Sequence, residues 1–228
     1  MPAKYSIAID GPAGAGKSTV ARGVAQALGY RHVDTGAMYR AVTLLALETK
    51  VDLNDDLALG ELANNAKIDI IEGRGKNTTI LLNGKDVSEK IRDPRVSRNV
   101  SRVASVPAVR EVLAAAQSAM AADGGVVMEG RDIGTVVIPG ADFKFFIVAS
   151  GRERAKRRAL ELENMGFTVD LEKLTEEIKA RDFSDSSREV NPLRPAADAK
   201  VIDCTAMTAV EVIDIIVNIV NKVTEGRS

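Results

Sequence analysis

The N-terminal stretch reads YSIAIDGPAGAGKSTVARGVAQALG over residues 5–29 and contains the pattern that decides the fold. Its first part, residues 5–9, is a short apolar run that predicts a buried strand. A glycine-rich loop follows from Gly11 to Gly16, and residues 17–28 then carry apolar side chains at helical spacing until Gly29 ends the helix. A strand, a glycine loop and a helix in this order predict the opening of a parallel α/β sheet.

The loop in this stretch matches the phosphate-binding pattern G-x-x-x-x-G-K-S/T. Glycines let backbone N–H groups turn toward phosphate oxygens, and the helix that follows points its positive dipole end at the same oxygens. The Lys17 ammonium can reach the β- and γ-phosphates of a nucleotide, and the Ser18 hydroxyl can bind Mg²⁺. Because a strand precedes the loop and a helix follows it, we expect the loop to bind phosphate rather than to be a chance glycine-rich turn.

The rest of the chain continues the same architecture and adds one insertion. Further strands are predicted at residues 31–33, 126–128, 143–148 and 200–203, and helices at 38–47, 106–121, 152–164, 171–181 and 209–223. Two β-rich runs, 68–71 and 78–82, flank a polar turn at 72–77 and predict a small antiparallel hairpin. A chain of 228 residues has room for one such domain with small insertions.

Composition excludes several classes of protein. Lys and Arg number 31 against 32 Asp and Glu, and aromatic residues make up 4%, which disfavours a general nucleic-acid binder. The single cysteine, Cys204, cannot form an internal disulfide, and the single histidine, His32, excludes any site that needs two. No apolar run approaches 18 residues and the start lacks a secretory signal, so we expect a cytoplasmic protein that does not enter membranes.

The basic residues indicate which class of phosphate-loop protein this is. The base-reading N-K-x-D and switch D-x-x-G strings of GTPases do not occur. A small-molecule kinase needs a second anion site, segments that exclude water, and arginines that neutralise the transferred phosphoryl group. Arg40, Arg110, Arg131 and Arg181 stand near predicted element ends, and residues 152–158 are expected to concentrate positive charge that repels itself. For any single arginine, a solvated helix face is an equally good interpretation.

Two later motifs resemble those of the bacterial cytidylate kinase family. Residues 34–40 read DTGAMYR and residues 129–137 read EGRDIGTVV, and together with the phosphate-binding loop they form a specific set. Residues 178–185 and 191–199 are similar to the later motifs of that family. The resemblance extends over nearly the whole chain, although the phosphate-binding loop alone would not be specific.

The resemblance implies transfer of the γ-phosphoryl group of ATP to CMP or dCMP, with Mg²⁺, giving ADP and CDP or dCDP. It also implies the nucleoside-monophosphate-kinase fold, an α/β fold with a parallel sheet flanked by helices, a small β-containing acceptor-binding insertion and a helical lid. We expect the core at residues 1–60 and 101–228, the insertion at 61–100 and the lid at 152–168. The expected protein is a monomer that binds ATP and CMP or dCMP, but neither nucleic acid nor membrane.

The same resemblance implies individual site residues. ATP binding is expected at Gly11, Pro12, Ala13, Gly14, Ala15, Gly16, Lys17, Ser18 and Thr19. CMP binding is expected at Thr35, Arg40, Ser101, Arg110, Arg131, Asp132, Arg181 and Asp185. Catalysis is expected to depend on Lys17, Arg131, Arg157, Arg181 and Arg188, the lid-side arginines Arg157 and Arg188 approaching the ATP phosphates. Mg²⁺ is expected to bind Ser18 directly and Glu129 through a water molecule. Asp is also common in the family at the position of Glu129.

Within that set, Arg40, Arg131 and Arg181 are expected to bind the acceptor phosphate and Asp185 the ribose. Arg110 can donate hydrogen bonds to the cytosine acceptors, while Asp132 or Ser101 can accept from its amino group. Uracil presents a carbonyl in place of that amino group, so this chemistry is compatible with CMP rather than UMP. The CMP phosphate is already an anion and needs no strong base, so we expect His32 to be a structural neighbour of the sheet.

Two alternatives remain open from the sequence. One is a phosphate-loop kinase that acts on a different nucleotide or on a small alcohol such as shikimate. The other is a nucleotide-dependent regulatory module without any acceptor, which would hydrolyse ATP and phosphorylate nothing.

Overall fold

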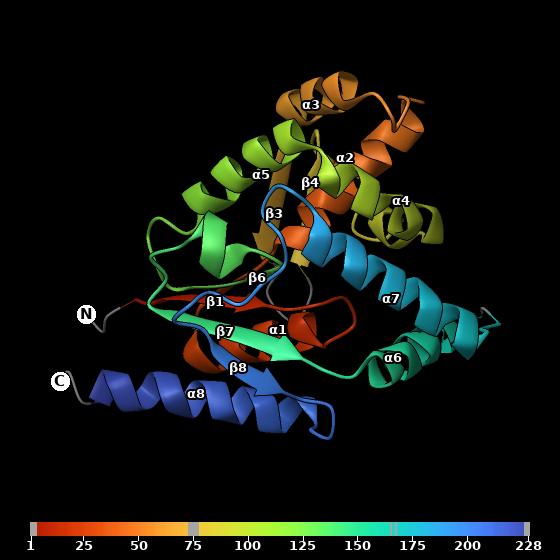
Figure 1. Ribbon diagram of the computed structural model, residues 1–228. Helices are drawn as coiled ribbons and strands as arrows, with labels where there is room; N and C mark the ends of the chain where they lie inside the picture. The colour runs from red at the N-terminus through yellow and green to blue at the C-terminus, as the bar shows by residue number, and fades with distance from the viewer. Residues whose placement is uncertain (1–3, 73–77, 165, 167, 226–228) are drawn as a thin grey trace. The chain divides into compact units, whose positions relative to one another are not determined.

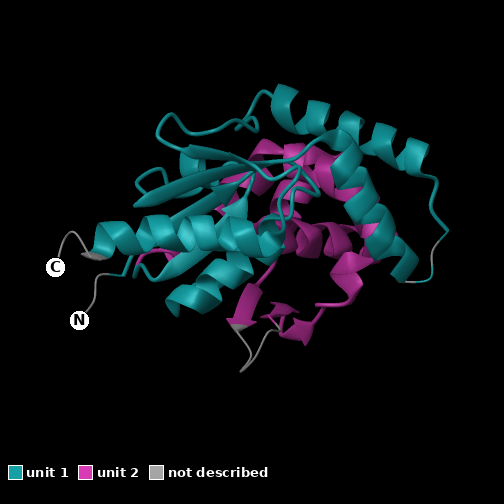
Figure 2. Ribbon diagram, turned by 90° about the horizontal axis from the view of Figure 1, so that it is seen from below, with its two compact units in different colours: residues 1–32, 123–228 teal, residues 33–122 magenta. Residues whose placement is uncertain are grey.

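A computed structural model describes residues 4–72, 78–164, 166 and 168–225 of the chain (Figure 1). The chain divides into two compact units, one of residues 1–32 and 123–228 and the other of residues 33–122 (Figure 2). The polar turn predicted at 72–77 lies almost wholly outside the described residues, as do residues 165 and 167 of the predicted lid.

The first unit is built on a parallel sheet with the strand order β2-β6-β1-β7-β8. The strands of this sheet are β1 (Ser6–Asp10), β2 (Arg31–Asp34), β6 (Val126–Gly130), β7 (Phe143–Val148) and β8 (Lys200–Asp203), and the last two residues of β2 belong to the second unit. The central strand β1 pairs in parallel with β6 and β7, and its Ile7 and Ile9 are fully buried. Asp10 stands opposite Gly130 in the register, so the phosphate-binding loop and the 129–137 motif leave the sheet at the same edge.

Two pairs of helices accompany this sheet. Helices α1 (Lys17–Leu28) and α8 (Ala209–Glu225) contribute Val20, Val24, Val212 and Ile216 to the same buried core as β1. Helices α6 (Gly151–Asn164) and α7 (Leu171–Ser187) pack on each other through a separate small apolar cluster. The apolar spacing of residues 17–28 predicted the buried face of α1 correctly.

The second unit combines helices with a small antiparallel sheet. The helices are α2 (Thr35–Glu48), α3 (Asp56–Asn65), the short η1 (Lys90–Arg92), α4 (Pro94–Ser105) and α5 (Pro107–Met120), and the strands are β3 (Ile68–Glu72), β4 (Thr78–Leu82) and β5 (Lys85–Asp86). Strand β3 pairs antiparallel with β4 from Ile68 opposite Leu82 to Glu72 opposite Thr78, which confirms the predicted hairpin. Ala37 and Leu44 of α2 share a buried cluster with Ile80 and Leu82 of β4.

The predicted α/β fold class is confirmed, but helix α3 was not predicted from the sequence. Helix α7 ends at Ser187 rather than at residue 181, and in its last turn the hydroxyls of Ser186 and Ser187 donate back to the carbonyls of Asp182 and Phe183. The insertion expected at 61–100 belongs to the compact unit 33–122, and its role in acceptor binding stays a prediction. None of the helices described is long and apolar enough to cross a membrane.

Candidate active site

The phosphate-binding loop leaves β1 through Gly11 and enters α1 at Lys17. Gly11 has a φ of +150°, and a Cβ at this position would lie 2.1 Å from the carbonyl oxygen of Ile147. Gly16, with a φ of 91°, is the N-cap residue of α1. Because it has no side chain, the first amide groups of α1 face the loop, which is the arrangement that binds phosphate at helix N-termini.

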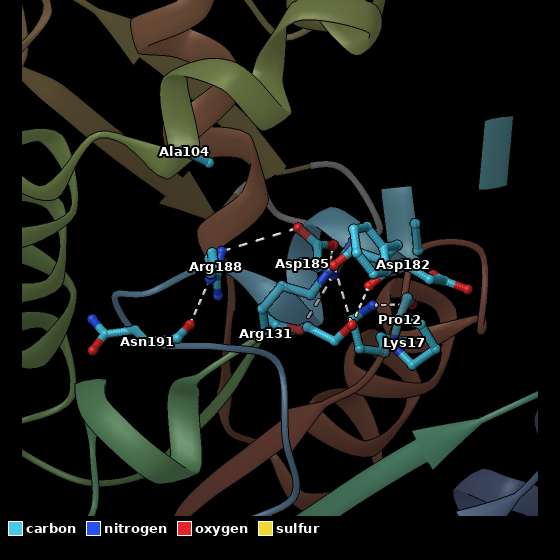
Figure 3. Close-up of polar contacts among 12 residues, drawn as sticks. Pro12, Lys17, Ala104, Arg131, Asp182, Asp185, Arg188 and Asn191 are labelled. Carbon is cyan, nitrogen blue, oxygen red and sulfur yellow. Dashed lines mark hydrogen bonds and ion pairs between the residues drawn. The ribbon is translucent and has the colours of Figure 1, made fainter. Parts of the chain in front are cut away.

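Lys17 is buried, and its ammonium donates a hydrogen bond to the carbonyl oxygen of Pro12 at 2.8 Å (Figure 3). Burial lowers the pKa of Lys17 to about 7; the charges of Arg131 and Arg181 act in the same direction, and Glu129 and Asp10 oppose them. Lys17 therefore lies within electrostatic reach of two arginines and two carboxylates. A phosphate group bound there would favour the charged ammonium.

Ser18 and Glu129 form the predicted magnesium pair. The Ser18 hydroxyl donates to Glu129 Oε2 at 2.9 Å, and Glu129 lies buried at the carboxyl end of β6. The other carboxylate oxygen, Oε1, lies 3.1 Å from His32 Nε2, so the ring donates to it in the tautomer protonated at Nε2. Hydroxyl and carboxylate oxygens are ligands that suit Mg²⁺. His32 is thus a neighbour of the sheet, as expected, but it also contacts a predicted site residue.

Four predicted acceptor or catalytic residues meet within the first unit. The Arg131 guanidinium donates from Nε to Asp185 Oδ2 at 2.9 Å, and Arg188 Nη1 lies 4.0 Å from Asp185 Oδ1 (Figure 3). Arg188 is also tied to its own loop by a bond from Nε to the Asn191 carbonyl. Burial alone would raise the pKa of Asp185, but the charges of Arg131, Arg181 and Arg188 outweigh it and hold that pKa below its ordinary value. The carboxylate therefore remains ionised beside these arginines.

The arginines of α6 differ from the sequence prediction. Arg154 is buried, and its guanidinium is bound in bidentate fashion by Asp182 of α7 while also donating to the carbonyls of Ala13 and Ala149. The next two, Arg157 and Arg158, pair with Glu153 and Glu161. The expectation of a self-repelling positive cluster is therefore wrong for these three residues, because carboxylates offset their charge.

Arg157 nevertheless reaches the phosphate-binding loop. Its Nη2 donates to the Cys204 carbonyl at 3.0 Å and its Nη1 to the Ala15 carbonyl at 3.4 Å. The position of a Cβ on Gly16 would lie 3.6 Å from the same Nη1. This contact with the loop is compatible with the predicted role of Arg157 near the ATP phosphates.

In the second unit, Thr35 and Arg40 lie at the start of α2. The Asp34 side chain caps this helix by accepting from the Ala37 amide at 3.0 Å, and its other oxygen accepts from Arg40 Nη2 at 2.9 Å. Thr35 is buried at the first helical position. The carboxylate cap therefore orients Arg40 toward the N-terminus of its own helix.

The predicted base-reading residues Ser101 and Arg110 belong to neighbouring helices of the same unit. Arg110, on α5, is 2% exposed and donates to the Ala104 carbonyl of α4 at 3.0 Å. Its guanidinium also lies over the Tyr39 ring, 5.5 Å from the centroid. Ser101 is half-buried on α4, one turn before Ala104. The third predicted reader, Asp132, is buried in the first unit.

Comparisons with known proteins decide the family. A sequence model of the family described as Cytidylate kinase matches residues 7–222. The chain is 56% identical over 216 residues to a cytidylate kinase from Desulforamulus reducens, covering 95% of this chain and 96% of that one. It is 52% identical over 222 residues to a cytidylate kinase from Pelotomaculum thermopropionicum, covering 97% of each.

The chain belongs to the cytidylate kinase family. Among solved structures, an uncharacterised protein from Eubacterium ventriosum has a similar fold, with a TM-score of 0.52 at 13% identity and coverage of 96% of this chain and 99% of that one. At that identity the likeness shows the fold alone.

For this cytidylate kinase family member, the structure adds residues that sequence reasoning did not assign to the site. Arg154 and Asp182 hold α6, α7 and the loop together, His32 contacts Glu129, and Tyr39 lies under Arg110. Asp10, the last residue of β1, binds two backbone amides of the 129–137 motif. The sequence could have indicated Tyr39, because it lies inside the DTGAMYR motif. It could not have indicated the contacts of Arg154, His32 and Asp10, because their partners are distant in the chain.

Proposed function

We propose that this member of the cytidylate kinase family transfers the γ-phosphoryl group of ATP to CMP or dCMP. The observation that carries the proposal is the grouping of Lys17 with Arg131 and Arg181 beside the phosphate-binding loop, in a chain 56% identical to a cytidylate kinase. Three cations next to a phosphate cradle suit a reaction whose transition state is dominated by phosphoryl charge.

In the proposed reaction, an oxygen of the CMP phosphate attacks the γ-phosphorus of ATP. The bond from the γ-phosphorus to the oxygen bridging it to the β-phosphate breaks, and ADP leaves with the electron pair. The acceptor oxygen is already anionic at neutral pH, so no side chain has to remove a proton. Lys17 and the arginines align the two phosphates and neutralise the charge that moves between them.

Mg²⁺ is proposed to bind at Ser18, with Glu129 oriented toward the same place through the hydrogen bond that it accepts. When bound, the ion would reduce the negative charge of the nucleotide phosphates. No group of three or more His, Cys, Asp or Glu side chains that could hold a metal is found among the described residues. The ion is therefore expected to bind together with the nucleotide, whose oxygens complete its ligand set.

Acceptor choice is proposed to come from the residues that the family motifs indicate. Thr35, Arg40, Arg131 and Arg181 are proposed to bind the CMP phosphate. Ser101 and Arg110 are proposed to read cytosine with Asp132, and Asp185 to hold the ribose. We also propose that the protein acts as a cytoplasmic monomer, without nucleic-acid or membrane partners, and that residues 152–168 act as its lid.

A coupled assay tests the function directly. ADP formation is measured with MgATP and, in turn, CMP, dCMP, UMP, AMP and GMP, while thin-layer or mass analysis identifies the phosphorylated product. The expected result is rapid formation of CDP and dCDP with much slower turnover of the other acceptors. Preference for AMP, GMP or UMP would replace the proposed acceptor, and ADP formation without a diphosphate product would point to a regulatory nucleotide-binding module.

A further inference from the structure

Asp10 is the last residue of β1 and comes directly before Gly11 of the phosphate-binding loop. Its side chain is 4% exposed, and neither the motif comparison nor the proposed reaction gives it a role. Oδ1 accepts a hydrogen bond from the Ile133 amide and Oδ2 accepts one from the Gly134 amide, both at 2.8 Å. A single buried carboxylate is therefore satisfied by two consecutive backbone N–H groups from a segment more than a hundred residues away.

Those two amides begin the turn that follows the predicted acceptor-binding pair Arg131 and Asp132. Residues Ile133–Val137 form one π-helical turn, and the Asp132 carbonyl accepts from the Val136 amide at 2.9 Å. Because the first amides of a helical turn have no partner within it, an external acceptor fixes the direction in which the chain enters the turn. Asp10 supplies that acceptor and so fixes the backbone immediately after Asp132.

The turn also meets Asp10 at a residue without a side chain. A Cβ on Gly134 would lie 3.5 Å from Asp10 Oδ2 and 3.2 Å from the Lys144 side chain, so the turn approaches the carboxylate at a glycine. An uncharged side chain at position 10 could accept from one of these amides without the cost of burying a charge. Burial raises the pKa of Asp10 to about 6; the two amides oppose this, the charge of Asp132 adds to it, and Lys17 opposes it.

We propose that Asp10 is a positioning residue for the acceptor, which holds Arg131 and Asp132 at a fixed place relative to the phosphate-binding loop. Asp10 does not touch a substrate, and it acts through the turn at 133–137. The inference rests on the proposed function, since it assigns Arg131 and Asp132 to the acceptor. The backbone of β1 is held independently by β6 and β7, so loss of the carboxylate should disturb the acceptor side more than ATP binding.

The test compares Asp10→Asn with Val220→Ala, which shortens a buried side chain of α8 outside the site. Asn can accept from only one of the two amides and turns an N–H toward the other. We expect Asp10→Asn to raise the KM for CMP at least about tenfold and to lower kcat/KM for CMP relative to UMP, with the KM for ATP changed less than about threefold. Val220→Ala is expected to lower the melting temperature and to leave both KM values within about twofold.

Hydrogen exchange gives a second readout that needs no substrate. Peptides spanning 131–138 should exchange faster in Asp10→Asn than in the parent, while peptides of α1 and α8 should not change. Unchanged exchange at 131–138, or equal rises in KM for CMP and ATP, would overturn the proposal. Should Asp10→Asn fail to fold, Asp10→Ser, which keeps one acceptor, is subjected to the same measurements.

The same design separates this proposal from the proposed function. The parent protein is assayed first against all five acceptors. Should it prefer another nucleotide, the function as proposed fails, and the Asp10 comparison is repeated with the preferred acceptor. A selective loss for that acceptor with faster exchange at 131–138 would still support Asp10 as a positioning residue, and equal losses for acceptor and ATP would refute it.

Discussion

Two arginine pairs of the first unit, those of Arg131 and Arg154, differ from the Arg40 pair of the second unit in how far apart the partners lie in the sequence. In the first unit, Arg131 pairs with Asp185 and Arg154 with Asp182, partners that lie 54 and 28 residues away in the sequence. In the second unit, Arg40 pairs with Asp34, six residues away, which is also the N-cap of its own helix. A pair whose partners are distant in the sequence joins separate elements, so its loss should destabilise the packing of more than one element. A pair whose partners are close in the sequence is local, and its loss should affect one helix end.

The largest loss of activity is expected for a substitution of Lys17, which lies within electrostatic reach of Arg131 and Arg181. Lys17→Ala should lower kcat on the order of 100-fold or more, because its ammonium is the group placed to meet charge that grows during transfer. Lys173→Ala, an exposed change at the start of α7, serves as the charge-matched control. A near-normal kcat in a correctly folded Lys17→Ala variant would contradict a catalytic role for the phosphate-binding loop.

Arg154→Ala breaks the long-range kind of pair. It should lower the free energy of unfolding by about 3 kcal/mol, since it strips the Asp182 carboxylate and two backbone carbonyls of their donors. Arg158→Ala on the same helix removes only a surface pair with Glu161 and should cost less than about 1 kcal/mol. Urea denaturation measures the unfolding free energy of each variant. Equal losses of stability would contradict the distinction between pairs that join separate elements and pairs within one helix.

The pH dependence of stability probes the burial of the Asp10 carboxyl, which raises its pKa against the opposing effect of the two amides. The folded-state pKa of about 6 lies above the ordinary value of 3.8, so the folded protein retains this proton between these pH values while the unfolded chain releases it. The contribution of Asp10 is therefore fully present below pH 4 and is lost as pH rises through 6. Between pH 4 and 7, the stability of the parent relative to Asp10→Asn should fall by at most about 3 kcal/mol. A difference independent of pH would show that the carboxyl titrates normally.

Acceptor selectivity tests whether Arg110 and Asp132 read the base. Arg110→Ala in the second unit and Asp132→Ala in the first should each lower kcat/KM for CMP more than for UMP, reducing their ratio by about tenfold. The measurement is a pair of kcat/KM values for each variant. Equal losses for the two nucleotides would mean that these residues shape the pocket without reading the base.

The smallest effect is expected for the local pair. Asp34→Ala removes the cap of α2 and the partner of Arg40, at a cost of about 1 kcal/mol in unfolding free energy. Both Asp34→Ala and Asp34→Asn should raise the KM for CMP, because each removes the carboxylate that orients Arg40. Asp34→Asn keeps a capping side chain, so it should recover most of the lost stability. A loss from Asp34→Ala as large as that from Arg154→Ala would contradict the contrast between the units.

The same contrast explains what the sequence could predict. The glycine loop, the strands and the hairpin at 68–82 follow from local patterns, and the DTGAMYR motif indicated the α2 site because its contacts are local. The bonds of Asp10 with Gly134 and of His32 with Glu129 span 124 and 97 residues, so no spacing rule reports them. The charge of Arg154 was misjudged for a related reason, since the carboxylate that neutralises it lies on another helix. The partners of Arg157 and Arg158, in contrast, lie three or four residues away on α6, so helical spacing could have indicated them.

Gly11 limits which sequences this fold can accept. Any side chain there would occupy the place of the Ile147 carbonyl, a backbone atom that cannot rotate away, and the φ of +150° is unfavourable for other residues as well. Exposed Gly140, by contrast, has nothing within 4 Å of an added Cβ. In a saturation library, position 140 should therefore tolerate a broad set of residues, whereas position 11 should return glycine alone. The fraction of non-glycine codons recovered at position 11 would therefore measure how stringently such an experiment selects for folded protein.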